Sequence, residues 1–132
     1  MSKFTKIEQE LFYAIYRGKC KDVDRLLYDG ADPGVEDPAS GMQPIHLAAR
    51  YGNIKILSSL LRDNRVRADS VDRRGKVPYE WAEEFSHAQA ESLLVNEILA
   101  HPSRYGMDAV NQAKHHVEIK TEPSPKQNPL AQ

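Results

Sequence analysis

Apolar residues recur near the start of the chain at the spacing of short amphipathic helices. Thr5 is followed three residues later by Glu8, a capping-box pattern, and the next apolar positions fall on one helical face. Gly18 predicts the end of this helix, because a left-handed C-cap favours glycine. Asp22 then opens a second helix that ends at Gly30. The apolar residues of this helix pair are Ile7, Leu11, Ala14, Ile15, Val23, Leu26 and Leu27.

The same pattern returns twice at a step of 34 residues. Pro44 and Pro78 open the second and third copies at first-turn positions, where a missing N–H costs nothing. Each helix pair is too small to bury its apolar face alone, so stacked copies must share one core. The pattern therefore predicts an all-α solenoid of three stacked helix-turn-helix units joined by loops or hairpins. The residues that coincide are Ala14, Ala48 and Ala82; Gly18, Gly52 and Ser86; and Leu26, Leu60 and Leu94.

The central copy carries the signature of a known family. Residues 41–52 read Gly-Met-Gln-Pro-Ile-His-Leu-Ala-Ala-Arg-Tyr-Gly, which resembles the G-x-T-P-L-H-x-A-A-x-x-G pattern of ankyrin repeats. Residues 26–32 resemble the family's L-L-x-x-G-A-D. The flanking copies match less well, as terminal repeats do because one side faces water. The resemblance implies an ankyrin-repeat domain over residues 5–100, with repeats at about 7–36, 41–70 and 75–100.

Residues 101–132 are predicted to form a flexible C-terminal tail. Half of the 8 prolines fall in this segment, which also holds few large apolar side chains. A short helix around residues 107–114 is compatible with this composition. The apolar end of the third copy is then covered either by another protein or by the C-terminal segment itself, through Tyr105, Met107 and Val110.

Composition excludes several classes of protein. The chain has 132 residues, a formal charge of −1 and one cysteine. Charge balance argues against a general nucleic-acid binder, and a lone cysteine excludes an internal disulfide or cysteine zinc site. No apolar run approaches the roughly 18 residues of a membrane span. We expect a cytoplasmic or nuclear protein with no membrane partner.

No set of residues forms a catalytic or metal-binding pattern. The resemblance gives His46 a structural role, bonding to neighbouring backbone. His115–His116 lacks further ligands at a metal-binding spacing, and the adjacent carboxylates of Glu83–Glu84 do not converge on one point. Cys20 has no histidine at a fixed spacing that would activate it. We expect no enzyme activity, no cofactor and no metal.

The resemblance instead implies protein binding on the concave side of the array. That side is built from exposed positions of each first helix and from the loop tips. Five of the six exposed helix positions hold Tyr, Arg or Phe, which are enriched in interface hot spots or interface cores. The predicted partner-binding residues are Tyr16, Arg17, Met42, Arg50, Tyr51, Arg73, Arg74, Lys76, Glu84 and Phe85.

Two further segments carry charge or a short motif. The loop from Arg62 to Lys76 holds six cations against three acids, which fits either a solvated loop or an acidic partner. Residues 119–122, Ile-Lys-Thr-Glu, resemble the Ψ-K-x-E acceptor of the modifier SUMO, and Ser124 precedes a proline as in proline-directed phosphorylation sites. Lys120 and Ser124 are therefore candidate modification sites.

These observations leave two interpretations open. The chain is a small adaptor or complex subunit that binds a protein partner. Alternatively, it is a nuclear regulatory cofactor of a transcription or chromatin complex, with a modifiable tail. In both cases we expect a monomer or one subunit of a hetero-complex, with no direct contact to nucleic acid.

Overall fold

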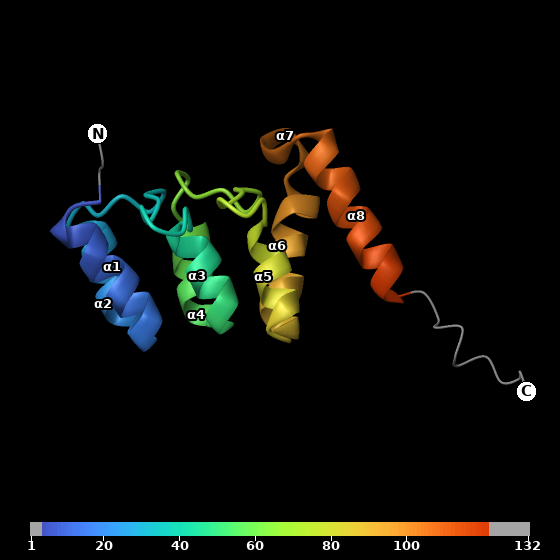
Figure 1. Cartoon of the computed structure of the whole chain (residues 1–132). Coiled ribbons are helices and arrows are strands. Elements are labelled where there is room, and N and C mark those ends of the chain that lie inside the picture. The colour runs from blue at the N-terminus through green and yellow to red at the C-terminus, as the bar shows by residue number, and fades with distance from the viewer. Residues whose placement is uncertain (1–3, 122–132) are drawn as a thin grey trace, which may run out of the picture.

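The computed structural model describes residues 4–121, which form helices and connecting loops without strands. Three antiparallel helix pairs stand side by side, and one further helix closes the far end (Figure 1). The predicted all-α solenoid is confirmed. None of the described helices is long and apolar enough to cross a membrane. The helices are α1 (Lys6–Arg17), α2 (Cys20–Tyr28), α3 (Pro44–Tyr51), α4 (Ile54–Leu61), α5 (Pro78–Glu84), α6 (Ala88–Ala100), α7 (Pro102–Tyr105) and α8 (Met107–Thr121).

Small residues set the distance between neighbouring helix pairs. Ala14 is buried on α1, where it lines a pocket between α1 and α2. Ala48 and Ala82 are fully buried on α3 and α5, where the first helices stack on one another. A larger side chain there would push the pairs apart, because protein interiors are already close-packed. Residues that lie 34 positions apart in the sequence therefore occupy equivalent places in successive helix pairs, as the repeat pattern predicted.

The folded part extends beyond its expected end at Ala100. Residues 102–105 and 107–121 form α7 and α8, and α8 packs against α6. Tyr105 and Val110 are buried there, as predicted by the alternative in which the C-terminal segment covers the end of the third copy. Met107, the third residue named in that alternative, is exposed. Most of residues 101–121 are thus helical rather than a flexible tail. The contact surface is small, since it consists mainly of Tyr105, Val110 and Ala113, and so gave little periodic signal in the sequence.

Polar contacts also hold this segment in place. The Tyr105 hydroxyl donates to Glu97 Oε2 at 2.9 Å. The Arg104 guanidinium donates to the carbonyl oxygens of Asn64 and Val66 at 2.8 and 2.7 Å. Because these carbonyls lie in the loop after α4, the C-terminal helices fasten that loop as well as the end of the array.

We expect Val110→Asp to lower the free energy of unfolding by about 2 kcal/mol or more, since it buries an unpaired carboxylate between α8 and α6. The neighbouring Asn111 is exposed, so Asn111→Asp adds the same charge without burial and should change stability by no more than about 0.5 kcal/mol. Urea denaturation followed by circular dichroism measures both. Equal midpoints for the two variants would show that α8 does not stabilise the array.

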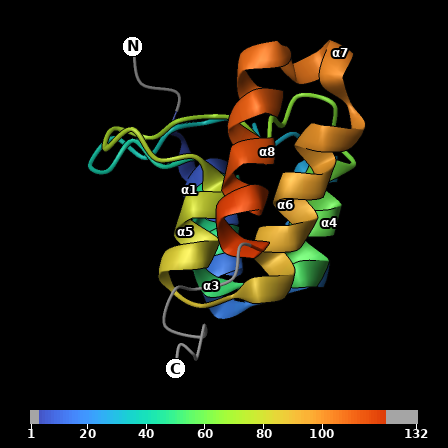
Figure 2. The same ribbon diagram turned by 90° about the vertical axis from the view of Figure 1, so that its right-hand side faces the viewer.

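Two loops connect the repeats, and both project over the side formed by α1, α3 and α5 (Figure 2). Their chains reverse at Gly41 and Gly75, whose φ angles are +73° and +80°. The loops also contact each other: Arg73 donates to the Ala39 carbonyl at 2.9 Å. A side chain at Gly41 would lie 2.8 Å from Arg73 Cβ, whereas one at Gly75 would meet nothing within 4 Å.

The different surroundings of Gly41 and Gly75 allow the cost of backbone strain to be measured separately from the cost of a steric clash. Both Gly41→Ala and Gly75→Ala place a side chain at positive φ, which costs about 1–2 kcal/mol. Only Gly41→Ala also pushes the two loops apart, so we expect it to destabilise by at least about 1 kcal/mol more. Thermal unfolding of both variants tests this. The close loop contact would be contradicted if Gly75→Ala were the more damaging change.

His46 joins the start of α3 to the following loop. It is fully buried, its Nδ1 accepts the Gln43 N–H at 3.0 Å, and its Nε2 lies 2.9 Å from the Ser70 carbonyl. An Nε2–H donor satisfies both contacts, so the ring is neutral. Burial lowers the pKa of His46 and outweighs the opposing effects of the Ser70 hydrogen bond and the Asp72 charge. The structural role predicted for His46 matches this placement.

The lowered pKa makes stability depend on pH. Unfolded His46 takes up a proton near its ordinary pKa of 6.5, while the folded form resists protonation. The contribution of His46 is therefore complete above that pH and is lost as pH falls, at up to about 1.4 kcal/mol per pH unit. We expect the His46→Gln variant to be less stable than wild type. Between about pH 7.5 and 5.5, however, its free energy of unfolding should fall by less than that of wild type. His115→Gln, at an exposed position, should retain the wild-type pH dependence. Denaturant titrations at both pH values decide this.

Candidate partner-binding surface

The first helices of the repeats place a line of aromatic side chains and one arginine beneath the loops. We call Tyr16, Tyr51, Arg50, Phe85 and Trp81 the aromatic–arginine row. The Tyr16 and Tyr51 rings meet edge to face at 5.6 Å, and the Arg50 Cζ lies 5.7 Å from the Tyr51 ring centre and 5.0 Å from that of Phe85. Phe85 stacks on Trp81 at 6.0 Å. The row thus runs without interruption across α1, α3 and α5.

Much of this row is open to solvent. Tyr16 is 60% exposed, and Tyr51 and Phe85 are each 40% exposed, whereas Trp81 is only 4% exposed. Aromatic rings bury large areas with few rotatable bonds, which suits them to binding a partner. Trp81 is the buried member of the row and packs beneath the exposed Phe85 ring. The sequence pattern singled out Phe85 but not Trp81, although the position of Trp81 one helical turn before Phe85 places the two rings on one helix face.

A buried carboxylate connects this support to the loop above. Asp72 Oδ2 accepts the Trp81 Nε1–H at 2.7 Å, and Oδ1 accepts the backbone N–H groups of Arg74 and Lys76 at 3.0 and 2.9 Å. Burial alone would raise the pKa of Asp72, but its hydrogen bonds to the Lys76 and Arg74 N–H groups and to the Trp81 indole lower it. Asp72 therefore stays ionised and fixes both the loop tip and the indole ring.

Two cations from the loop tip extend the row. Lys76 Nζ lies 4.4 Å from the Trp81 ring centre and forms an ion pair with Glu84. The Arg74 Cζ lies 5.7 Å from the same ring. The structure thus brings the predicted residues Arg74, Lys76 and Glu84 to one end of the row.

Three predicted positions do not join this row. Met42 is buried in the core, because the chain turns inward after Gly41; its expected exposure at the loop tip is corrected. The Arg73 guanidinium is bound to the Ala39 carbonyl between the loops. Arg17 donates to the Tyr13 hydroxyl at 2.7 Å, one turn back along α1.

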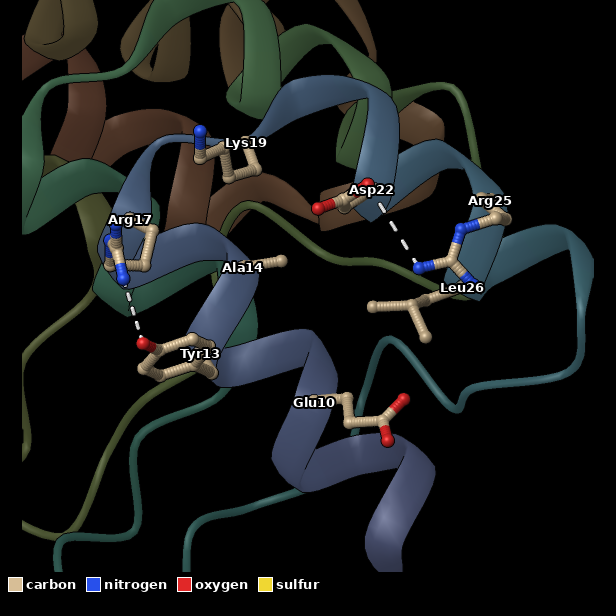
Figure 3. Close-up of a pocket in the computed structure, with 8 residues that line it drawn as sticks. All are labelled: Glu10, Tyr13, Ala14, Arg17, Lys19, Asp22, Arg25 and Leu26. Carbon is tan, nitrogen blue, oxygen red and sulfur yellow. Dashed lines mark hydrogen bonds and ion pairs between the residues drawn. The ribbon is translucent and has the colours of Figure 1, made fainter.

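Arg17 instead lines a separate pocket between α1 and α2 (Figure 3). Ala14 and Leu26 also line this pocket, and charged side chains from both helices surround them. The later repeats lie behind this pocket in the view, so it belongs to the open end of the array. A charged outer face is what a terminal repeat needs to stay in water.

The arginine-rich loop is paired within itself. Arg65 meets Asp63 at 2.8 Å and Arg67 meets Asp69 at 2.9 Å. These pairs are exposed and each contributes at most about 1 kcal/mol to stability. They satisfy the charges of Arg65 and Arg67 locally, so this part of the loop fits the solvated alternative better than the acidic-partner alternative.

A second charged cluster lies where α8 meets α5 and α6. His116 Nε2 lies 2.5 Å from Glu91 and 3.9 Å from Glu83, and these three could hold a metal ion. However, Lys120 Nζ lies 3.4 Å from Glu91 and 3.6 Å from Glu83. This ammonium already supplies the positive charge, which disfavours a cation there. Glu84 turns toward Lys76 instead, so Glu83 and Glu84 do not converge, as expected.

This cluster also changes the setting of the tail motif. Lys120 lies in the last turn of α8 and not in an extended segment, so that part of the expectation is wrong. Its pKa is raised: burial, the largest effect, lowers it, but the neighbouring Glu91 and Glu83 outweigh that effect. Ser124 lies outside the described residues.

Comparisons with known proteins agree with this architecture. A family model described as three copies of the ankyrin repeat matches residues 11–117. This chain belongs to the ankyrin-repeat family. The matched range includes most of α8, in agreement with the folded end seen here. The ankyrin-repeat array is accordingly a module for binding protein partners.

Several relatives of this ankyrin-repeat chain carry names that refer to kinases. Cyclin-dependent kinase 4 inhibitor B from Bos taurus is 40% identical over 70 residues, which are 53% of each chain. Cyclin-dependent kinase inhibitor 2A from Homo sapiens is 39% identical over 70 residues, 53% of this chain and 44% of the relative. Human cyclin-dependent kinase 4 inhibitor B is 36% identical over 77 residues, 58% of this chain and 55% of the relative. The chain therefore spans about half the length of the curated relatives it matches.

Proposed function

We propose that this chain is a non-enzymatic adaptor or complex subunit that holds a protein partner on its concave face. The aromatic–arginine row carries this proposal. Its exposed rings form one continuous strip, and soluble proteins seldom expose such strips without a binding role. The row is held from below by Trp81 and Asp72, so it needs little reordering when a partner binds.

The names of the relatives suggest which partner to test first. They are inhibitors of cyclin-dependent kinases, and we propose a kinase of this class as the partner. A protein held against such a kinase would act as its regulator. The chain would then work in the cytoplasm or the nucleus, as a monomer that enters a hetero-complex.

Purified cyclin-dependent kinase 4 is the probe for this proposal, with binding measured by calorimetric titration. We expect Arg50→Ala and Tyr51→Ala each to weaken binding about tenfold or more, because both side chains lie at the centre of the row. Their melting temperatures should stay within a few degrees of wild type, since neither side chain is in the core.

Tyr28→Ala is the matched control, because Tyr28 is an aromatic residue that is 90% exposed on α2, outside the row. It should bind the kinase like wild type. Absence of binding by the wild-type chain rejects the kinase. Wild-type affinity in both row variants rejects the row as the contact surface.

The alternative of a nuclear regulatory cofactor has less support. It relied on Lys120 as a modification site in an exposed, extended tail, but the Lys120 ammonium is paired with Glu83 and Glu91. We therefore place binding through the concave face ahead of it.

A further inference from the structure

Two arginines of the concave face differ from the other cations around them. Arg65 and Arg67 are paired with aspartates, and Lys76 is paired with Glu84. By contrast, the guanidinium groups of Arg50 and Arg74 contact only aromatic rings among the described residues. Their N–H donors are therefore available to a ligand.

Both groups lie over the same ring, and they come from different elements. Arg50 extends from α3 and Arg74 from the loop before α5, and each Cζ is 5.7 Å from the Trp81 ring centre. Stacking on an aromatic face restricts the guanidinium plane and leaves its edge donors free. The Trp81 ring is itself fixed by its hydrogen bond to Asp72. The two arginines are thus held in place before any ligand arrives.

Local charge indicates what kind of ligand fits. Arg50, Arg74 and Lys76 carry three positive charges around Trp81, while Glu84 and Asp72 carry two negative ones, which leaves a surplus of one. A single carboxylate balances this surplus. A phosphate with nearly two charges would exceed it and would face repulsion from Glu84 and Asp72.

We infer that Arg50 and Arg74 together bind one carboxylate side chain, from Glu or Asp, on the partner protein. This deepens the proposed function and rests on it for the partner being a protein. Carboxylates bind guanidinium groups through short, charge-assisted hydrogen bonds. Apolar residues beside that carboxylate would lie on the exposed rings of Tyr51 and Phe85, so the partner segment is acidic at one position and apolar around it.

Three synthetic peptides test the inference directly: acetyl-Leu-Ala-Glu-Ala-Leu-amide and its analogues with Gln or phosphoserine at the centre. The side-chain Nε–Hε signals of arginine are followed by NMR during titration to about 10 mM peptide, a range that detects weak contacts. We expect the Glu peptide to shift the Arg50 and Arg74 signals together, at a concentration at least about threefold lower than the Gln peptide needs.

Arg25 provides the internal control, since it is exposed and already paired with Asp22 and Asp29. Its signal should move little with any peptide. Three results would each overturn the inference: no shift with the Glu peptide, an equal response to the Gln peptide, or an equal shift at Arg25. Tighter binding of the phosphoserine peptide would overturn the choice of carboxylate.

Variants separate this inference from the proposed function. Arg50→Gln and Arg74→Gln keep side-chain bulk and remove the charge, and each should weaken the Glu peptide about fivefold or more, whereas Arg25→Gln should not. If both variants still bind cyclin-dependent kinase 4 like wild type, the carboxylate contact is wrong while the kinase proposal stands. If wild type fails to bind the kinase but the peptides behave as expected, the kinase proposal alone fails.

Discussion

The close approach of successive helix pairs at Ala48 and Ala82 is the constraint on which the structure depends. Because these side chains are buried where the first helices stack, the repeats must keep one register along the array. The positions two and three residues later then come into line on the open face. Tyr16 and Tyr51 meet there, and Arg50 joins Tyr51 to Phe85, because the same register brings these positions together. The core and the candidate binding surface are therefore two consequences of one register.

The two ends of the array shield their terminal apolar faces from water in different ways. A stacked repeat leaves one apolar face without a neighbour at each end. At the start, charged side chains of α1 and α2 surround the pocket lined by Ala14 and Leu26. At the other end, α8 covers α6 and brings its own ion pairs with it. The first end thus presents charged side chains, whereas the other end is covered by a helix of the chain itself.

Charge in this protein acts through local pairing more than through net charge. The overall charge of −1 conceals local clusters in which Arg65, Arg67 and Lys120 each have an acid beside them. Asp72 is the acid with the widest effect, since it is buried, ionised and bound to both the loop tip and Trp81. It holds the Trp81 ring on which Arg50 and Arg74 lie, and among the described residues the guanidinium groups of these two arginines contact only aromatic rings.

The sequence by itself determined the family, the three helix pairs and most of the residues on the open face, because these follow from spacing within each repeat and from local capping. It did not reveal that Met42 is buried, that Arg73 joins two loops or that Trp81 supports the row. Those facts depend on contacts between residues distant in the chain. The helix α8 was also decided by tertiary structure, since its few buried side chains gain their stability only against α6.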